Sequence, residues 1–351
     1  MRKQLVLLLA VLAQALLASA QFKSENLFYM VDNAESFESF RKNAAQISIV
    51  SPQVFNMSKE GVLTGSIHPK ILEVARANTV KVMPLIVNTG FNTAILHAVV
   101  SSPIARKRAI DMMLIFAKEY RLDGWQFDME GLSIEDRENF TTFFQQTADS
   151  LHHHNLQLSA AVVHATANTG GTDAYHKFLY EDWRAGYDFR AMALAGDFLS
   201  IMTYGEHTRR TTPGPVAGAD WVDHVVQYLL QEGVPPQKLS LGIPSYSLYW
   251  YTDYTEEKGG FSTSKSLKYP ELRYLMERYN AKPQWNEKAQ VNSLVVDNDG
   301  IYEYVFIEDG ASLKPKLDIL KKYHLRGISV WVLGSETPDF WTTLSQSVIR
   351  N

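Results

Sequence analysis

The chain has 351 residues, of which 46% are hydrophobic and 21% are charged, so it can bury a large core and is neither disordered nor fibrous. This length fits two ordinary domains or one barrel of the α/β type, and it excludes a single small module. The formal net charge of −4 gives no basic footprint, so we expect neither nucleic acid nor an anionic membrane surface as a partner.

The first twenty residues have the pattern of a secretory signal peptide. Arg2 and Lys3 precede an apolar run over 5–17, and the small residues 18–20 follow it. The run is shorter than the roughly 20 residues that span a bilayer. We therefore expect cleavage after Ala20 and a secreted or periplasmic mature protein, residues 21–351, with no membrane attachment. The mature chain would carry a formal charge of −6, because the removed segment has two basic residues and no acidic one.

Several kinds of site are missing from the sequence. The absence of cysteine excludes disulfides, cysteine nucleophiles and thiolate metal sites. There is no HExxH motif, phosphate-binding loop or dinucleotide fingerprint, and the histidines at 152–154 end a helical pattern, where they suit the helix dipole. We expect no cofactor, no metal and a monomer.

Short β-type apolar runs alternate with longer amphipathic runs along the chain, as in βα units around a parallel sheet. The eight strand candidates are 27–31, 47–50, 80–87, 124–129, 157–163, 198–204, 238–243 and 327–333. The clearest helical patterns between them are 104–120, 134–154 and 221–231. Eight parallel strands interleaved with helices predict an α/β fold, the (β/α)8 TIM barrel.

The regular alternation breaks after the seventh strand candidate. Strand-like runs at 291–296 and 301–307 flank the turn sequence DNDG, which is typical of an antiparallel hairpin and foreign to a parallel barrel. We therefore predict a small α+β insertion over 247–325, between barrel strands 7 and 8. Its predicted helices are 269–278 and 313–323. No linker or repeat separates it from the barrel, so 21–351 is expected to form one catalytic unit.

The fourth strand candidate carries the residues that suggest chemistry, in the sequence LDGWQFDMEG. Because side chains alternate along a strand, Gln126, Asp128 and Glu130 share the face that points into the barrel. The two acids reach the C-terminal end of the strand, where active sites of this fold lie. Burying two unpaired acids there would destabilise the fold, so their presence indicates a function. On spacing alone, a structural role is as well supported as a catalytic one: Asp128 could cap the next helix, and Glu130 could form an ordinary ion pair with Arg or Lys.

The strand DGWQFDME resembles the DGxDxDxE strand of glycoside hydrolase family 18, the chitinase family, with Gln126 at the position of the first catalytic-strand aspartate. An amide there is also found in the branch that includes spore-cortex-lytic and other cell-wall N-acetylglucosaminidases. Further segments that resemble this branch are ISIVSPQVFNMSKEGVL (47–63), MTYGEHTRRTTPGPVAGADWV (202–222), LSLGIPSYSLYW (239–250), FIEDGASLKPKLDIL (306–320) and LRGISVWVLGSE (325–336). The resemblance therefore extends over about residues 25–345.

The resemblance implies an exported hydrolase that cleaves β-1,4-linked glycans containing N-acetylglucosamine, such as peptidoglycan or chitin, with retention. Glu130 would be the general acid, and Asp128 would orient the 2-acetamido group of the substrate, whose oxygen is the nucleophile. Tyr204 would hydrogen-bond the acetamido carbonyl, although Gly205 stands where the family usually has Asp. We expect Gln126 to hydrogen-bond Asp128 and, because it is uncharged, to leave Asp128 ionised to lower pH than in a carboxylate pair.

Other residues near strand ends are candidates for substrate binding. Trp331 would form the floor under the reacting sugar, because the faces of pyranose rings are apolar C–H surfaces that stack on an indole. Either Glu206 takes over part of the polar role of the missing aspartate, or substrate binding is reduced at this position. The remaining candidates are Tyr246, Trp250 and Trp285 as extensions of the aromatic platform and Asn88 as a lining residue of the cleft. A barrel-filling role is the alternative for Tyr204.

The rival function is a catalytically weak or inactive carbohydrate-binding barrel, a kind of protein that this family also contains. Gln126 and Gly205 favour the rival, whereas Glu130, which such members usually lose, favours the enzyme. The sequence leaves the natural glycan and the choice between endo and exo action open.

Overall fold

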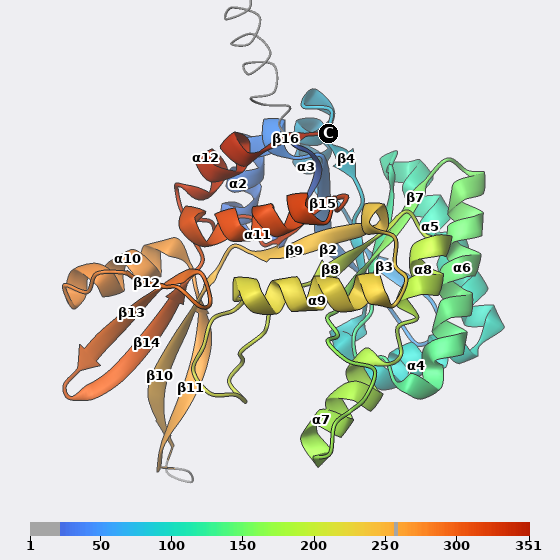
Figure 1. The fold of residues 1–351 in the computed structure, drawn as a ribbon. Coiled ribbons are helices and arrows are strands. Elements are labelled where there is room, and N and C mark those ends of the chain that lie inside the picture. The colour runs from blue at the N-terminus through green and yellow to red at the C-terminus, as the bar shows by residue number, and fades with distance from the viewer. Residues whose placement is uncertain (1–21, 256–258) are drawn as a thin grey trace, which may run out of the picture.

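The structure is a computed structural model that describes residues 22–255 and 259–351. Its centre is a closed barrel of eight parallel strands (Figure 1), and the β1–β2 and β1–β15 ladders complete the circle. Around the barrel the strands are β1 (Phe22–Met30), β2 (Ile49–Met57), β5 (Leu85–Asn88), β6 (Gly124–Asp128), β7 (Gln157–Val163), β8 (Phe198–Met202), β9 (Leu239–Pro244) and β15 (Gly327–Trp331). The TIM-barrel prediction is confirmed, and every strand candidate overlaps one barrel strand. The predicted signal peptide lies outside the described residues.

Helices cover the outside of the barrel, and short strands extend its sheet (Figure 1). The three helices predicted from periodicity are α5 (Pro103–Tyr120), α6 (Arg137–His153) and α9 (Ala219–Gln231). The others around the barrel are α2 (Ala34–Asn43), α3 (Pro69–Ala77), α4 (Thr93–Ser101), α8 (Phe189–Ala195), α11 (Gly310–Lys322) and α12 (Phe340–Ser347), and the short strands are β3 (Leu63–Gly65), β4 (Lys81–Val82) and β16 (Val348–Arg350). A further helix, α7 (Ala174–Leu179), projects from the segment between β7 and β8 (Figure 1). In the described ranges, no helix has the length and apolar character needed to cross a membrane.

Local sequence explains where these elements begin and end. Ser102 caps α5 by accepting a hydrogen bond from the Ala105 N–H at 3.2 Å, and Pro103 occupies the first helical turn, where its missing N–H is not needed. The helix ends at Arg121, whose φ of 54° is left-handed. The strand that follows alternates as predicted, because the Trp125 indole donates to the Met113 carbonyl of α5 while its neighbour Gln126 points into the barrel.

A second, antiparallel sheet projects from the barrel after β9 (Figure 1). Its order is β11 (Gly259–Leu267), β10 (Ser247–Thr255), β14 (Ile301–Ile307), β13 (Val291–Asn298) and β12 (Gln284–Asn286). The helix α10 (Tyr269–Arg278) covers one face with Leu272 and Leu275, which join an apolar cluster with Leu294 and Val305. The predicted hairpin is therefore present, and its turn is held by Asp297, which accepts from the Gly300 N–H at 2.7 Å.

The helix predicted at 313–323 is α11, and its packing differs from that expected of a helix of the insertion. It contacts α9 and α12 of the outer helical layer and strand β9, as well as β13 of the small sheet. Leu313, Leu317 and Leu320 belong to the main core rather than to the cluster under α10. The departure from the barrel therefore closes at β14, and α11 returns the chain to β15. The apolar pattern of this segment predicted a helix, but it did not predict that the helix packs in the outer layer of the barrel.

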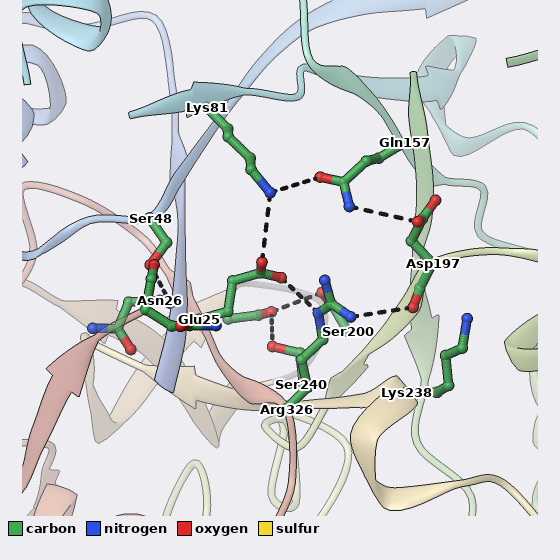
Figure 2. A network of polar contacts seen from close by, with 12 residues as sticks. Glu25, Asn26, Ser48, Lys81, Gln157, Asp197, Ser200, Lys238, Ser240 and Arg326 are labelled. Atoms are coloured by element: carbon green, nitrogen blue, oxygen red, sulfur yellow. Dashed lines mark hydrogen bonds and ion pairs between the residues drawn. The ribbon is translucent and has the colours of Figure 1, made fainter. Parts of the chain in front are cut away.

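The N-terminal end of the barrel is closed by paired charges (Figure 2). Glu25 on β1 accepts from Arg326 Nε at 2.6 Å, and Lys81 Nζ lies 3.8 Å from the other carboxylate oxygen. Lys81 also donates to Gln157 at 3.0 Å, and the amide nitrogen of Gln157 lies 3.5 Å from Asp197. The carboxylate of Glu25 thus lies between two cations, and this end of the barrel is built for stability.

Candidate active site

The two acids of β6 open into a cavity at the C-terminal end of the barrel. Asp128 is the last residue of the strand and is buried, and Glu130 follows on the same side and is partly buried. The cavity has a volume of about 330 Å³. Its lining consists of Tyr29, Gln53, Phe91, Asp128, Glu130, Ala161, Met202, Tyr204, Tyr246 and Trp331. Neither acid forms an ion pair within the described part of the chain, and the next helical segment is capped by Ser133, so the cap and ion-pair alternative is wrong.

Burial dominates the electrostatics of the two acids. It raises the pKa of Asp128 well above its ordinary value, and the charge of Glu130 raises it further, while a hydrogen bond from Gln53 opposes the shift. Burial also raises the pKa of Glu130, as a proton donor near neutral pH requires. Whether Gln126 leaves Asp128 ionised to lower pH than a carboxylate at position 126 would stays a prediction. In this chain, desolvation is the largest influence on the pKa of Asp128.

Gln126 lies below the cavity and does not line it. Its amide nitrogen donates to the Tyr29 hydroxyl at 2.7 Å and to Ser200 Oγ at 2.9 Å, and its amide oxygen has no hydrogen-bond partner among the described residues. The expected hydrogen bond to Asp128 is therefore wrong, and Gln53 takes that place. Gln126 and Asp128 are two residues apart on one strand, which separates them by roughly 6.5–7 Å, whereas neighbouring strands are only about 4.8 Å apart. Residues on neighbouring strands are therefore closer hydrogen-bond partners. Gln126 is placed to support Tyr29 rather than to touch a substrate.

Asn88, at the end of β5, is fully buried and holds the backbone of Glu130. Its side-chain oxygen accepts from the Glu130 N–H at 3.1 Å, and its side-chain nitrogen donates to the Glu130 carbonyl at 3.1 Å. The same nitrogen donates to the Asn92 carbonyl at 3.1 Å. The predicted lining role is therefore wrong. Asn88 is a positioning residue that fixes the backbone from which the Glu130 side chain projects.

The segment after β8 brings Tyr204 into the cavity but not Glu206. Tyr204 lines the cavity beside the two acids. Gly205 has a left-handed φ of 79° and no neighbouring atom within 4 Å of the position a Cβ would take. Glu206 turns away and accepts from the Gly218 N–H at 2.6 Å, at the start of α9. The alternative in which Glu206 takes over the role of the missing aspartate is therefore wrong, because its carboxylate closes the 206–218 loop.

Two of the predicted platform aromatics line the cavity. Trp331, at the end of β15, lines the cavity with its ring centroid 5.5 Å from that of Tyr29, and Tyr246 lines it from the segment between β9 and β10. Trp250 is only 2% exposed and donates to the Gly214 carbonyl at 2.9 Å, so its proposed contact with substrate is wrong. Trp285 lies on β12, an outer strand of the small sheet, and is not among the lining residues.

Comparison with known proteins decides the family. The model of glycosyl hydrolases family 18 matches residues 24–336, which is most of the chain. The chain belongs to glycosyl hydrolase family 18. The family resemblance predicted from the β6 motif is confirmed.

Relatives of this family 18 protein include bacterial glycosylases, cortical fragment-lytic enzymes and chitinases. It is 26% identical over 322 residues to the uncharacterized glycosylase YvbX of Bacillus subtilis strain 168, covering 90% of this chain and 89% of that protein. It is 25% identical over 295 residues to the cortical fragment-lytic enzyme of the same organism, covering 83% of this chain and 65% of the relative. The crystal structure of a chitinase from Chromobacterium violaceum ATCC 12472 superposes with a TM-score of 0.81 at 27% identity, covering 92% of this chain and 98% of that one. The protein is a glycosidase with spore-cortex-lytic enzymes and chitinases among its homologues.

The active-site cavity of this family 18 glycosidase includes residues that sequence reasoning missed. They are Tyr29, Gln53, Phe91, Ala161 and Met202. Tyr29, Ala161 and Met202 lie near the C-terminal ends of barrel strands and pack on the inner side, so strand alternation carries a signal for them. Gln53 precedes an irregularity in the β2–β5 register, and Phe91 lies in a loop with a left-handed φ of 51°. Neither of these two positions follows from alternation.

The described part of the family 18 chain has no group of three or more His, Cys, Asp or Glu residues arranged to hold a metal ion. The side chains that can transfer or share a proton in the cavity are the two carboxyl groups and the tyrosines around them. Burial raises the pKa of Tyr204 well above its ordinary value, so its hydroxyl keeps its proton and can donate a hydrogen bond.

Proposed function

We propose that the protein hydrolyses β-1,4-linked glycans that contain N-acetylglucosamine, namely peptidoglycan or chitin and its oligosaccharides, with retention and with assistance from the substrate. The observation that carries the proposal is the pair of acids, Asp128 and Glu130, in a cavity that also contains the Trp331 indole. An indole stacks on the apolar face of a pyranose ring. A sugar on Trp331 would lie in the same cavity as both acids and Tyr204.

The mechanism assigns one task to each group. Glu130 donates its proton to the glycosidic oxygen as the bond to the leaving sugar breaks. The 2-acetamido oxygen attacks the anomeric carbon and forms an oxazolinium ion, while Asp128 accepts a hydrogen bond from the acetamido N–H and Tyr204 donates one to the acetamido oxygen. Water, deprotonated by Glu130, then opens the oxazolinium from the face that the leaving group occupied. Two inversions at the same carbon give retention.

The raised pKa values of the two acids support this division. Burial raises the pKa of both carboxyl groups, and the charge of Glu130 raises that of Asp128 further, so the pair holds one proton more readily than none. Positive charge on the oxazolinium favours the ionised form of Asp128, so the shared proton resides on Glu130 when the bond breaks. The developing charge of the substrate therefore selects the protonation state that the reaction needs.

The nature of the relatives supports the substrate class. A cortical fragment-lytic enzyme and a chitinase are both similar to this chain over most of its length. The amino-terminal signal pattern supports export, with action outside the cytoplasm as a secreted or periplasmic enzyme.

The decisive experiment measures release of reducing ends from chito-oligosaccharides and from peptidoglycan glycan strands. Glu130→Gln is expected to lower the rate about 10²- to 10⁴-fold, because it removes the general acid without changing the size of the side chain. Glu135→Gln, at an exposed position, is the matched control and is expected to retain the wild-type rate. An unchanged rate in Glu130→Gln contradicts the acid role, and an α-anomer as the first product of a β-linked substrate contradicts retention.

A weak or inactive carbohydrate-binding protein is the second candidate. It is favoured by Gly205, where the family usually has Asp and where the structure places no other carboxylate. Binding of chitotetraose by correctly folded wild-type protein, with no release of reducing ends from any of these glycans, would select this function instead.

A further inference from the structure

A second cavity lies in the segment that connects β7 and β8. Its volume is about 240 Å³, and its lining is rich in charged side chains. Three arginines and two acids contribute, namely Arg137, Arg184, Arg190, Asp188 and Glu232. The formal charge of the lining is therefore +1. The reaction proposed above uses none of these residues.

Arg184 and Arg190 of this cavity form no ion pair among the described residues, and Arg184 is the one of the two that is partly buried, because Arg190 is exposed. Arg137 lies 3.3 Å from Asp188, which accounts for one pair, and Arg190 and Glu232 balance each other in formal charge. Arg184 is partly buried and forms no ion pair within the described residues. Burial lowers the pKa of its guanidinium, and no carboxylate offsets that effect. A desolvated cation without a counter-ion is unfavourable, so its presence is better explained by an anion that comes from outside.

A fixed histidine orients this arginine. The Arg184 guanidinium donates to His164 Nε2 at 3.1 Å, and His164 Nδ1 donates to the Met202 carbonyl at 3.2 Å. Burial lowers the pKa of His164 to about 3, so the ring is neutral and its Nε2 is an acceptor. The Trp221 ring packs edge-on against the imidazole, with the centroids 4.8 Å apart. In the described part of the chain this is the only hydrogen bond of the Arg184 side chain, which leaves guanidinium N–H groups for a ligand.

The two cavities have no lining residue in common, but hydrogen bonds link their walls. Ala161 of β7 and Met202 of β8 line the catalytic cavity, and His164 follows β7 and binds the Met202 carbonyl. Tyr187 lines the second cavity and donates to the carbonyl of Met129, the residue between the two catalytic acids, at 2.7 Å. Figure 1 shows the α7 segment projecting from the same end of the molecule as the β10–β11 hairpin. A glycan that extends from the catalytic cavity along the β7–β8 side would therefore approach the wall that contains Arg184.

We propose that Arg184 binds a carboxylate carried by the glycan, so that the enzyme prefers acidic N-acetylated glycans to neutral chitin. This inference rests on the proposed function and names its substrate class. Guanidinium groups bind carboxylates through two parallel hydrogen bonds, and a partly desolvated site strengthens them. Peptidoglycan has the required chemistry, because its muramic acid units carry a lactyl group that ends in a carboxylate, whereas chitin has no charged substituent.

The test measures equilibrium binding by calorimetry in the Glu130→Gln background, which prevents cleavage. The ligands are chitotetraose, the peptide-free tetrasaccharide of alternating N-acetylglucosamine and N-acetylmuramic acid, and the same tetrasaccharide with its carboxylates converted to methyl amides. A muropeptide, whose carboxylates are on the peptide, separates that source from the lactyl group. Arg184→Gln keeps a donor for His164, and Arg273→Gln, on the exposed side of α10, is the matched control for net charge.

We expect Arg184→Gln to weaken binding of the acidic tetrasaccharide at least tenfold more than binding of chitotetraose or the methyl amide, whereas Arg273→Gln changes all three equally. Thermal unfolding checks that each variant is folded. Equal effects of Arg184→Gln on charged and neutral ligands overturn the inference while the proposed function stands. Failure of the Glu130→Gln protein to bind any of these glycans overturns both.

Discussion

The two ends of the barrel both contain carboxylates that are largely or fully buried, but they surround them differently. At the N-terminal end, Glu25 lies between Arg326 and Lys81 (Figure 2). At the C-terminal end, Asp128 and Glu130 lie beside each other with no cation paired to either in the described residues. The first arrangement neutralises charge and stabilises the fold. The second raises the pKa of both acids, which is unfavourable for folding and is explained by catalysis.

A chain of hydrogen bonds inside the barrel runs up to the catalytic end. Ser240, Ser329 and Ser200 are joined by hydroxyl contacts of 2.6 and 2.7 Å, and Gln126 links Ser200 to Tyr29. All of these groups are uncharged in this arrangement. The barrel interior therefore supports the cavity floor through neutral hydrogen bonds and places no counter-charge near the two acids.

Removal of Asp128 tests most directly whether the two ends differ in function. Asp128→Asn is expected to lower kcat about 10²- to 10³-fold, because the oxazolinium loses the carboxylate that stabilises its charge. Steady-state release of reducing ends from chitotetraose measures the effect. Glu25→Gln at the other end is the control, and it should leave kcat close to the wild-type value. A similar loss in both variants would mean that the two ends do not differ in function.

A substitution at the N-terminal end of the barrel tests whether the paired charges there stabilise the fold. Arg326→Met is expected to lower the free energy of unfolding by about 1–3 kcal/mol, because it leaves the largely buried Glu25 carboxylate with Lys81 as its only paired cation. Chemical denaturation measures the change. Arg41→Met removes an exposed ion pair with Glu38 and should have a smaller effect. A loss of kcat in folded Arg326→Met protein would contradict a purely structural role.

Asn88 tests whether backbone positioning matters at the catalytic end. Asn88→Ala is expected to lower kcat about tenfold with little change in KM, because Glu130 loses both hydrogen bonds that fix its backbone. Asn88→Asp keeps the acceptor for the Glu130 N–H and adds a negative charge, so the basic limb of its pH–kcat profile should shift to higher pH. Equal changes in KM and kcat, with an unshifted profile in Asn88→Asp, would indicate a general structural role instead.

Sequence reasoning predicted the barrel and the position of its acids because both follow from short-range periodicity. Alternation along β6 places Asp128 and Glu130 on the inner side at the strand end, and the 291–307 hairpin has its own turn sequence. The alternation of side chains along β15 also explains why Trp331 lines the cavity.

The wrong assignments depend on long-range packing that periodicity does not contain. Trp250 and Glu206 both hold the 206–218 loop, through Gly214 and Gly218. Asn88 and Gln126 bind groups on neighbouring strands or in the segment after β6. A residue's face can be inferred from alternation, but its depth below the cavity and its partners across the barrel cannot. The same limit hid Arg184, whose significance depends on its forming no ion pair among the described residues.

The pH dependence of stability also distinguishes the two ends, although its effect is the smallest. A carboxyl group whose pKa is higher in the folded than in the unfolded chain stabilises the fold fully below the unfolded pKa, and this contribution is lost as the pH rises through the folded pKa. Burial raises the pKa of Asp128 well above its ordinary value, so the wild type should lose stability relative to Asp128→Asn as the pH rises above about 4. Urea denaturation across this range measures the difference, with Asp299→Asn at the exposed hairpin turn as the control for replacing an acid by an amide. Parallel stability curves for wild type and Asp128→Asn would mean that the catalytic acids are as well compensated as Glu25.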